Sequence, residues 1–185
     1  MDSLMWAIGR VSGFVSMFLL TGTLLLGILA RSGRPLLVIP RFSLTLLHRN
    51  ISLLATVFLI LHVFTLLLDS YAQLNVVDLI VPFLGSYEPF WQGLGTVAFD
   101  LVLALIITGL LRQRMSQQAF RAVHWLNYAM WPIALAHSIG NGTDGADPWF
   151  ITSAALCVAM VLGAVTWRLS ARFLENAKSR QESVQ

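Results

Sequence analysis

The chain contains four histidines, and all of them lie inside strongly apolar segments. His48 and His62 are 14 residues apart in one segment, and His124 and His137 are 13 residues apart in another. Ionisable side chains are rare in lipid-spanning helices, so a functional role is the first hypothesis for them. Each pair spans about 20 Å of helix, which places one histidine toward each face of a bilayer core about 30 Å thick. Because neutral imidazole is a common axial ligand of haem iron, the spacing predicts two haems stacked across a membrane and electron transfer between them.

Two other roles are open to these histidines. A single histidine in a membrane helix can simply form a hydrogen bond to a neighbouring helix, although four in matched pairs make that role less favoured for the set. Zinc is a poorer interpretation, because histidines about 20 Å apart on one helix cannot share an ion. Four-coordinate zinc also needs nearby Cys, His or carboxylate ligands, and none lies within a turn or so of these histidines.

The composition is that of an integral membrane protein. The chain has 185 residues, of which 57% are hydrophobic and 11% charged, with a mean hydropathy of +0.74. An ordinary globular domain is about 25% charged. The net charge of +3 does not indicate nucleic-acid binding, because the basic residues flank the apolar segments. The lone cysteine, Cys157, excludes an intrachain disulfide and is expected to be a small core residue.

Five stretches are long and apolar enough to cross a membrane, so we expect an all-α bundle of five transmembrane helices. They run over Trp6–Ala30, Phe42–Leu68, Leu94–Leu111, Phe120–His137 and Trp149–Trp167. The first begins without a basic region and is too long for a signal peptide, so we interpret it as a retained helix. Residues 1–172 would form the helical domain and residues 173–185 a polar tail.

Charge differs between the two sets of loops. Basic residues follow the first, third and fifth stretches, whereas acidic residues follow the second and fourth. The positive-inside rule then places the N-terminus outside and the C-terminus in the cytoplasm. The loop Ser70–Gln92 is long and has an apolar centre; it could lie in the outer interface as a short helix or pack as a cap over the outer haem.

The second and fourth stretches both start at the cytoplasmic face and therefore run parallel. This direction pairs His48 with His124 near the cytoplasm and His62 with His137 near the outside. At about 100° per residue, His48 and His62 share a face, but His124 and His137 would be about 140° apart on an ideal helix. The fourth stretch must therefore be overwound, and we predict a 3₁₀-like irregularity over Tyr128–Leu135, near Pro132.

Four arginines and one tryptophan are candidate partners of the haems. Arg41, Arg49 and Arg121 lie near the inner histidines and could bind haem propionates through their guanidinium groups, or simply flank the membrane. Arg10 lies on the outer side, where it could bind an outer propionate or extend to the headgroups. Trp131 is near the midpoint between His124 and His137, where it could shorten the tunnelling gap or serve in packing.

These residues resemble the transmembrane domain of the ferric reductase/NADPH oxidase superfamily, in particular its compact bacterial members. The resemblance rests on His48-Arg49-Asn50 with His62, on Val123-His124-Trp125 with His137, and more weakly on Gly9–Gly13 and Gly142–Asp144. It implies two b-type haems, bis-histidine ligation by His48/His124 and His62/His137, and a multi-pass protein of the bacterial plasma (inner) membrane. It also implies electron flow from a cytoplasmic reduced flavin to an outer acceptor.

Few residues follow the fifth stretch, and no Gly-rich nucleotide motif appears in them. We therefore expect the electron donor to be a flavin (FAD or FMN) on a cytoplasmic NAD(P)H reductase partner, or a membrane quinol. Two other functions remain open: a haem-bearing anchor subunit of a periplasmic reductase fed by quinol, and a non-redox haem carrier.

Overall fold

The structure is a computed structural model that describes residues 2–32, 40–171 and 173. The elements in these residues are helical, as predicted. The long helices are α1 (Asp2–Arg31), α2 (Arg41–Leu68), α3 (Pro89–Leu110), α5 (Asn127–Asn141) and α6 (Pro148–Leu169). The shorter elements are α4 (Gln117–His124) and the 3₁₀ helices η1 (Val76–Leu79) and η2 (Arg112–Arg114).

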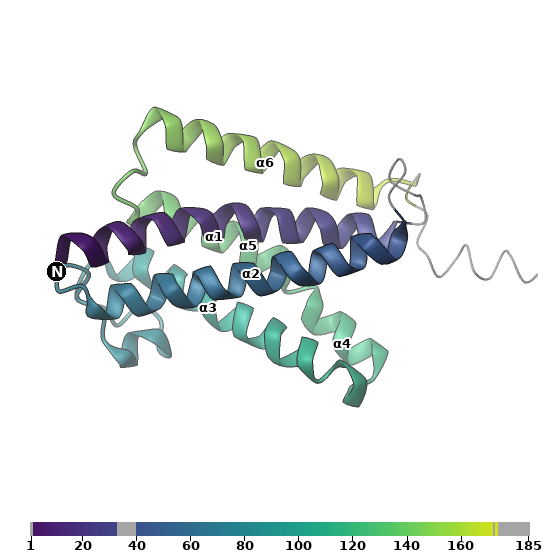
Figure 1. Cartoon of the computed structure of the whole chain (residues 1–185), viewed down its shortest axis with the longest axis horizontal. Coiled ribbons are helices and arrows are strands. Elements are labelled where there is room, and N and C mark those ends of the chain that lie inside the picture. The colour runs from purple at the N-terminus through teal and green to yellow at the C-terminus, as the bar shows by residue number, and fades with distance from the viewer. Residues whose placement is uncertain (1, 33–39, 172, 174–185) are drawn as a thin grey trace, which may run out of the picture.

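Two antiparallel helix pairs form most of the bundle (Figure 1). The helices α1 and α2 pack along their length, α3 packs against α5, and α6 lies beside α1. Chain direction alternates between successive long helices, so α2 and α5 run the same way, as predicted. One histidine pair is on α2, and the other is divided between the end of α4 (His124) and α5 (His137). The shared chain direction therefore places His48 opposite His124 and His62 opposite His137.

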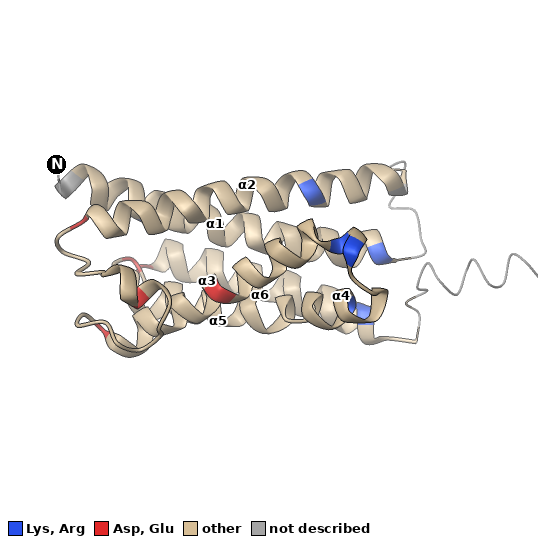
Figure 2. Cartoon of the chain, turned by 90° about the horizontal axis from the view of Figure 1, so that it is seen from below, with Lys and Arg blue, Asp and Glu red and all other residues tan. Residues whose placement is uncertain are grey.

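Most charges of the described residues separate along the bundle (Figure 2), the exceptions being Asp100 within α3 and Arg10, which pairs with Asp144. We call one end the basic end; it contains Arg31, Arg112, Arg114, Arg121 and Arg168. We call the other the acidic end; it contains Asp69, Asp78, Glu88, Asp144 and Asp147. Four helices among the described residues are long and apolar enough to cross a membrane, namely α1, α2, α3 and α6. The chain is therefore a multi-pass membrane protein.

The main core lies between α1, α5 and α6. Its buried members include Met17, Leu24 and Ile28 of α1, which pack against Trp131 of α5. From α6, Cys157 is fully buried in the same cluster and is a free thiol, so its predicted role as a core residue is confirmed. This core fixes α5 and α6 against α1 and leaves the opposite face of α1 to α2.

The prediction of one helix over Phe120–His137 is wrong, because the backbone breaks at Trp125–Leu126 between α4 and α5. The amide of Leu126 bonds the carbonyl of Val123 at 2.9 Å, and the amide of Ala129 bonds that of Leu126 at 3.0 Å. These i to i−3 bonds, with φ/ψ of −65°/−22° at Trp125, are those of a 3₁₀ turn.

The predicted kind of irregularity is thus confirmed, but it lies before most of the predicted range. Pro132 is inside α5 and the helix continues through it. Between His124 and His137, helix assignment is interrupted at the tightened turn, whereas α5 runs on through Pro132.

The loop between α2 and α3 folds over the acidic end as a cap. Its η1 begins with a capping box between Asn75 and Asp78, and Thr96 of α3 donates to the Asp78 carbonyl at 2.7 Å. Val76 and Ile80 remain more than half exposed, at 66% and 69%. The loop is therefore anchored on α3, while Val76 and Ile80 remain exposed on its outer side. Of the remaining predictions, the Arg41 side chain and nearly all of the tail 173–185 lie outside the described residues.

Candidate functional site

The four histidines lie as two facing pairs, in the combinations expected from the sequence; their role as metal ligands stays a prediction. His48 of α2 faces His124 at the end of α4, with ring centres 6.3 Å apart and ring planes at 75°. His62 of α2 faces His137 of α5, with ring centres 6.5 Å apart and ring planes at 76°. We call these the basic-end pair and the acidic-end pair. They lie about 20 Å apart along α2.

The separation within each pair fits two imidazoles on opposite sides of one metal ion. An imidazole nitrogen binds a transition metal at about 2.0–2.1 Å, and the ring centre lies about 1.1 Å further back, so two opposed rings have centres about 6.2–6.4 Å apart. The distance of 6.3 Å in the basic-end pair lies in this range, and that of 6.5 Å in the acidic-end pair lies just above it. Among the described residues no group of three His, Cys, Asp or Glu side chains gathers to hold a metal ion. Each site thus offers two nitrogens, the number of axial ligands that haem iron takes.

Hydrogen bonds fix which nitrogen of three rings is free to bind a metal. The Nδ1 of His62 lies 2.7 Å from the Gly9 carbonyl oxygen, and that of His48 lies 2.9 Å from the Thr23 carbonyl oxygen. The Nδ1 of His137 lies 2.8 Å from the carbonyl oxygen of Trp91. A carbonyl oxygen can only accept, so each Nδ1 must carry the proton and donate it. The lone pair is therefore on Nε2, which is left for a metal.

The fourth ring, His124, has no hydrogen-bond partner for Nδ1 within the described part of the chain. It stacks on Phe120 of its own helix, with ring centres 5.3 Å apart and planes at 20°. The guanidinium carbon of Arg112 lies 5.2 Å from the centre of that Phe120 ring. Side-chain packing thus orients His124 in place of a backbone carbonyl.

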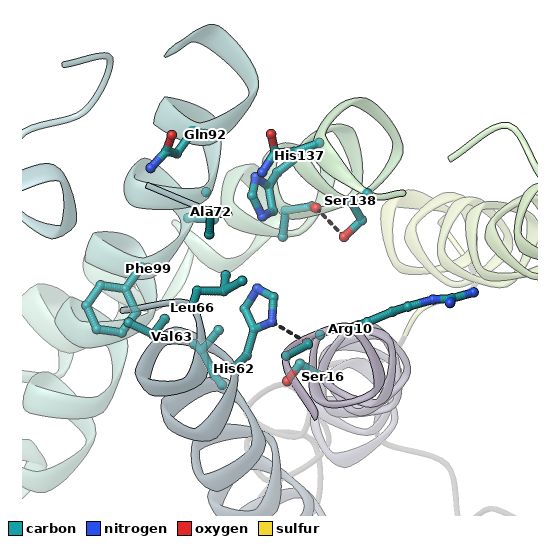
Figure 3. A pocket seen from close by; sticks show the side chains of 18 of the residues that line it. Arg10, Ser16, His62, Val63, Leu66, Ala72, Gln92, Phe99, His137 and Ser138 are labelled. Atoms are coloured by element: carbon teal, nitrogen blue, oxygen red, sulfur yellow. Dashed lines mark hydrogen bonds between the residues drawn. The ribbon is translucent and has the colours of Figure 1, made fainter. Parts of the chain in front are cut away.

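A cavity joins the acidic-end pair to the capping loop (Figure 3). Its volume of about 230 Å³ far exceeds the space one water molecule needs, which is about 10–15 Å³ by the same kind of measure. His62 and His137 face each other across it, with Val63, Leu66 and Phe99 at its apolar side. The capping loop contributes further lining residues, including Asp69, Tyr71, Leu79 and Tyr87. The loop thus combines both expected features: it lines the cavity, and it contains the short helix η1 with exposed apolar residues.

Arg10 forms an ion pair with Asp144. Both Nε and an Nη nitrogen of Arg10 donate to the carboxylate of Asp144, between α1 and the loop before α6. The guanidinium also lies over the Trp6 ring, 5.0 Å from its centre. In Figure 3 the side chain leads away from the gap between His62 and His137. This pairing explains how a basic residue is accommodated at the acidic end; the predicted bond to a propionate stays a prediction.

At the basic end Arg49 and Arg121 lie near the histidine pair in the chain, and both are exposed. Arg49 follows His48 on α2, and Arg121 lies one turn before His124 on α4. Three arginines that sequence spacing did not single out lie close enough to His124 to act on it electrostatically: Arg31, Arg112 and Arg168. They come from the ends of other helices, so only the tertiary fold brings them together.

Trp131 is packed in the core between the two histidine levels. Its side chain is 6% exposed, and its Nε1 donates to Thr21 Oγ1 at 2.9 Å. Thr21 in turn donates to the Met17 carbonyl at 2.8 Å. These contacts account for the residue by packing, and a role in tunnelling stays a prediction.

The fold and the site define a multi-pass helical membrane protein in which two histidine pairs face each other at different depths of the bundle. The chain belongs to the family described as ferric reductase like transmembrane component, whose model matches residues 12–135. The matched range contains His48, His62 and His124 and ends two residues before His137. No curated protein and no solved structure matches the chain. Family membership gives transmembrane electron transfer as the general function.

Proposed function

We propose that the chain is a b-type cytochrome that carries electrons across the membrane through two haems, one held by His48 and His124 and the other by His62 and His137. The observation that carries this proposal is that both the separation of the rings and their protonation suit one iron ion between each pair. Ring centres 6.3 Å and 6.5 Å apart suit one iron between each pair. In three of the four rings a carbonyl acceptor also leaves Nε2 free.

Haem bound at these sites supplies reversible one-electron exchange at its iron. The chain holds each ring in position, fixes its tautomer and excludes water with apolar helix faces. The arginines near His124 provide positive charge at the basic end, where carboxylate groups of a bound haem would be stabilised. With one site at each end of α2, the protein spaces two redox centres across the membrane.

We further propose that electrons enter at the basic end and leave at the acidic end. The positive-inside rule favours the basic end in the cytoplasm. Outward electron movement is then driven by the membrane potential, by about 2.3 kcal/mol per 100 mV for a full crossing. The donor in this proposal is a reduced flavin on a cytoplasmic partner protein, and the acceptor lies outside in the cell envelope.

Paired histidine variants test the haem assignment. His62→Ala and His137→Ala should each remove the same low-spin haem, and the double variant should lose no more than either single variant. His48→Ala and His124→Ala should remove the other haem, whereas His62→Ala combined with His124→Ala should remove both. The measurement is haem content with low-temperature absorption and EPR spectra of the purified proteins. If His62→Ala and His124→Ala abolish the same signal, the proposed pairing is wrong.

A reduction assay tests the proposed donor. Protein in sealed vesicles with a known orientation is mixed with a reduced flavin or with a reduced quinol analogue, and haem reduction is followed by stopped-flow absorbance. Flavin added at the basic end should reduce both haems in succession. Reduction by quinol alone would overturn the flavin proposal and favour an anchor subunit fed by quinol.

A further inference from the structure

The three hydrogen-bonded histidine rings share one local arrangement. Each Nδ1 donates to a backbone carbonyl of a neighbouring helix, and the residue four positions after that carbonyl is glycine. The carbonyl and glycine pairs are Gly9 and Gly13 for His62, Thr23 and Gly27 for His48, and Trp91 and Gly95 for His137. Two of the pairs are on α1 and one is on α3, so the arrangement arises on two different helices.

Helix geometry explains the spacing of four residues. The carbonyl at position i accepts the amide proton of position i+4, and the side chain of that later residue leans back toward the same carbonyl. The carbonyl has a second lone pair that an outside donor can use only if this side chain is small. Glycine at i+4 therefore opens a notch through which an imidazole reaches the carbonyl.

The tightness of each notch can be measured by the position a Cβ atom would take. A Cβ at Gly13 would lie 2.8 Å from both Nδ1 and Cε1 of His62. At Gly95 it would lie 2.6 Å from Cε1 of His137, and at Gly27 it would lie 3.3 Å from Cε1 of His48. The first two distances are shorter than real side chains tolerate, so the ring would have to move; the third is tight but can relax.

The notches on α1 match the histidines on α2 in register. Gly13 and Gly27 are 14 residues apart, as are His48 and His62, and the two helices are antiparallel. A Cβ at Gly109 of α3 or at Gly163 of α6 would meet no atom within 4 Å, whereas one at Gly93 or Gly140 would clash with the ring of Phe83 or Trp91 and not with a histidine. The glycines at the rings are thus distinguished from ordinary small residues of membrane helices.

We propose that Gly13, Gly27 and Gly95 are positioning residues that admit His62, His48 and His137 to a backbone carbonyl and so fix Nε2 as the atom that binds iron. This inference rests on the proposed haem function. Closing a notch should move the ring away from its carbonyl, which releases its orientation and its tautomer. The effect should be confined to the site where the notch lies.

Alanine variants of the haem-loaded protein test the proposal. Gly13→Ala and Gly95→Ala should each leave one low-spin haem per chain where the wild type has two, and the signal that is lost should be the one that His62→Ala removes. Gly27→Ala, with its milder contact, should keep both haems and shift the EPR signal and midpoint potential of the basic-end haem alone. The matched controls, Gly109→Ala and Gly163→Ala, should keep both signals as in the wild type.

Each other result overturns a distinct part of the account. Wild-type signals in all three notch variants would overturn the role of the glycines while leaving the haem proposal intact. Equal loss of both haems in the notch variants would also overturn it, since the effect would then be general damage to the bundle. If Gly13→Ala or Gly95→Ala does not fold, Gly27→Ala still decides, because an unchanged basic-end signal there contradicts the proposal. A wild type without haem would instead refute the proposed function.

Discussion

At the scale of the residue, each histidine is defined more by a partner on another helix than by its neighbours in sequence. The Gly9 carbonyl on α1 sets the protonation of His62, 53 residues later in the chain. A metal ligand held in this way has its ring plane and its tautomer fixed before the metal arrives. His124 lacks such a carbonyl among the described residues and is oriented by stacking on Phe120.

Trp131 and Thr21 offer a test of whether the buried tryptophan serves in packing or in electron transfer. Thr21→Val removes the hydrogen bond between them and keeps the indole ring, whereas Trp131→Phe removes both. Hydrogen bonds between membrane helices are worth about 0.6 kcal/mol on average and at most about 1.7 kcal/mol. We expect both variants to lower the free energy of unfolding, Trp131→Phe by more, with the rate of electron transfer between the haems unchanged. The measurements are denaturation in detergent and flash-induced electron transfer; a slower rate in Trp131→Phe alone would assign the indole a tunnelling role.

At the scale of the element, the break between α4 and α5 decides whether the basic-end pair can form. Two i to i−3 bonds around Leu126 tighten the turn. From α6, the guanidinium of Arg168 lies over the Trp125 ring at 4.7 Å and over the Tyr128 ring at 5.3 Å from their centres. These cation–π contacts hold both sides of the turn together, so α6 takes part in placing His124.

One extra residue in that turn should uncouple the two sites. An alanine inserted between Trp125 and Leu126 rotates α4 by about 100° relative to α5. We expect the basic-end haem to be lost and the acidic-end haem to be retained, as read from haem content and low-spin spectra. Pro132→Ala is the matched control and should keep both haems, because the tightened turn does not depend on the proline. Loss of the basic-end signal in Pro132→Ala would show that it does.

The sequence predicts the histidine pairs because their positions follow from two regular quantities, the rise per residue and the alternation of chain direction. It does not predict the carbonyl partners, since every residue carries a carbonyl and only the packing of α1 on α2 selects Gly9 and Thr23. The glycines four residues after these carbonyls could have been found from the sequence, because Gly13 and Gly27 have the same spacing of 14 residues as His48 and His62. The break at Trp125–Leu126 has no local signal, because neither residue is a helix breaker and Arg168 stabilises the turn from far along the chain.

At the scale of the whole molecule, the separation of charge along the bundle gives the protein a direction. The described arginines gather at one end, and Arg10 at the other is paired with Asp144. Basic residues are retained on the cytoplasmic side during insertion. We therefore propose that the basic-end pair lies toward the cytoplasm, where a soluble electron donor can reach it.

Labelling of single cysteines tests this orientation. In a Cys157→Ala background, Gln118→Cys places a thiol on α4 at the basic end, and Ala146→Cys places one in the exposed loop before α6. A maleimide that does not cross membranes should label Ala146→Cys in intact cells and Gln118→Cys only after permeabilisation. Labelling of Gln118→Cys from outside would reverse the proposed direction of electron flow.

The most direct test of the central claim is the haem content of the purified wild-type protein together with its reduced-minus-oxidised spectrum. The account predicts two b-type haems per chain, both low-spin in the oxidised and the reduced state, because each pair of rings offers two nitrogens to one iron. One haem per chain would contradict the stacked arrangement. If the protein holds no haem after expression with ample haem supply, the proposed function is wrong and the four histidines have a structural role.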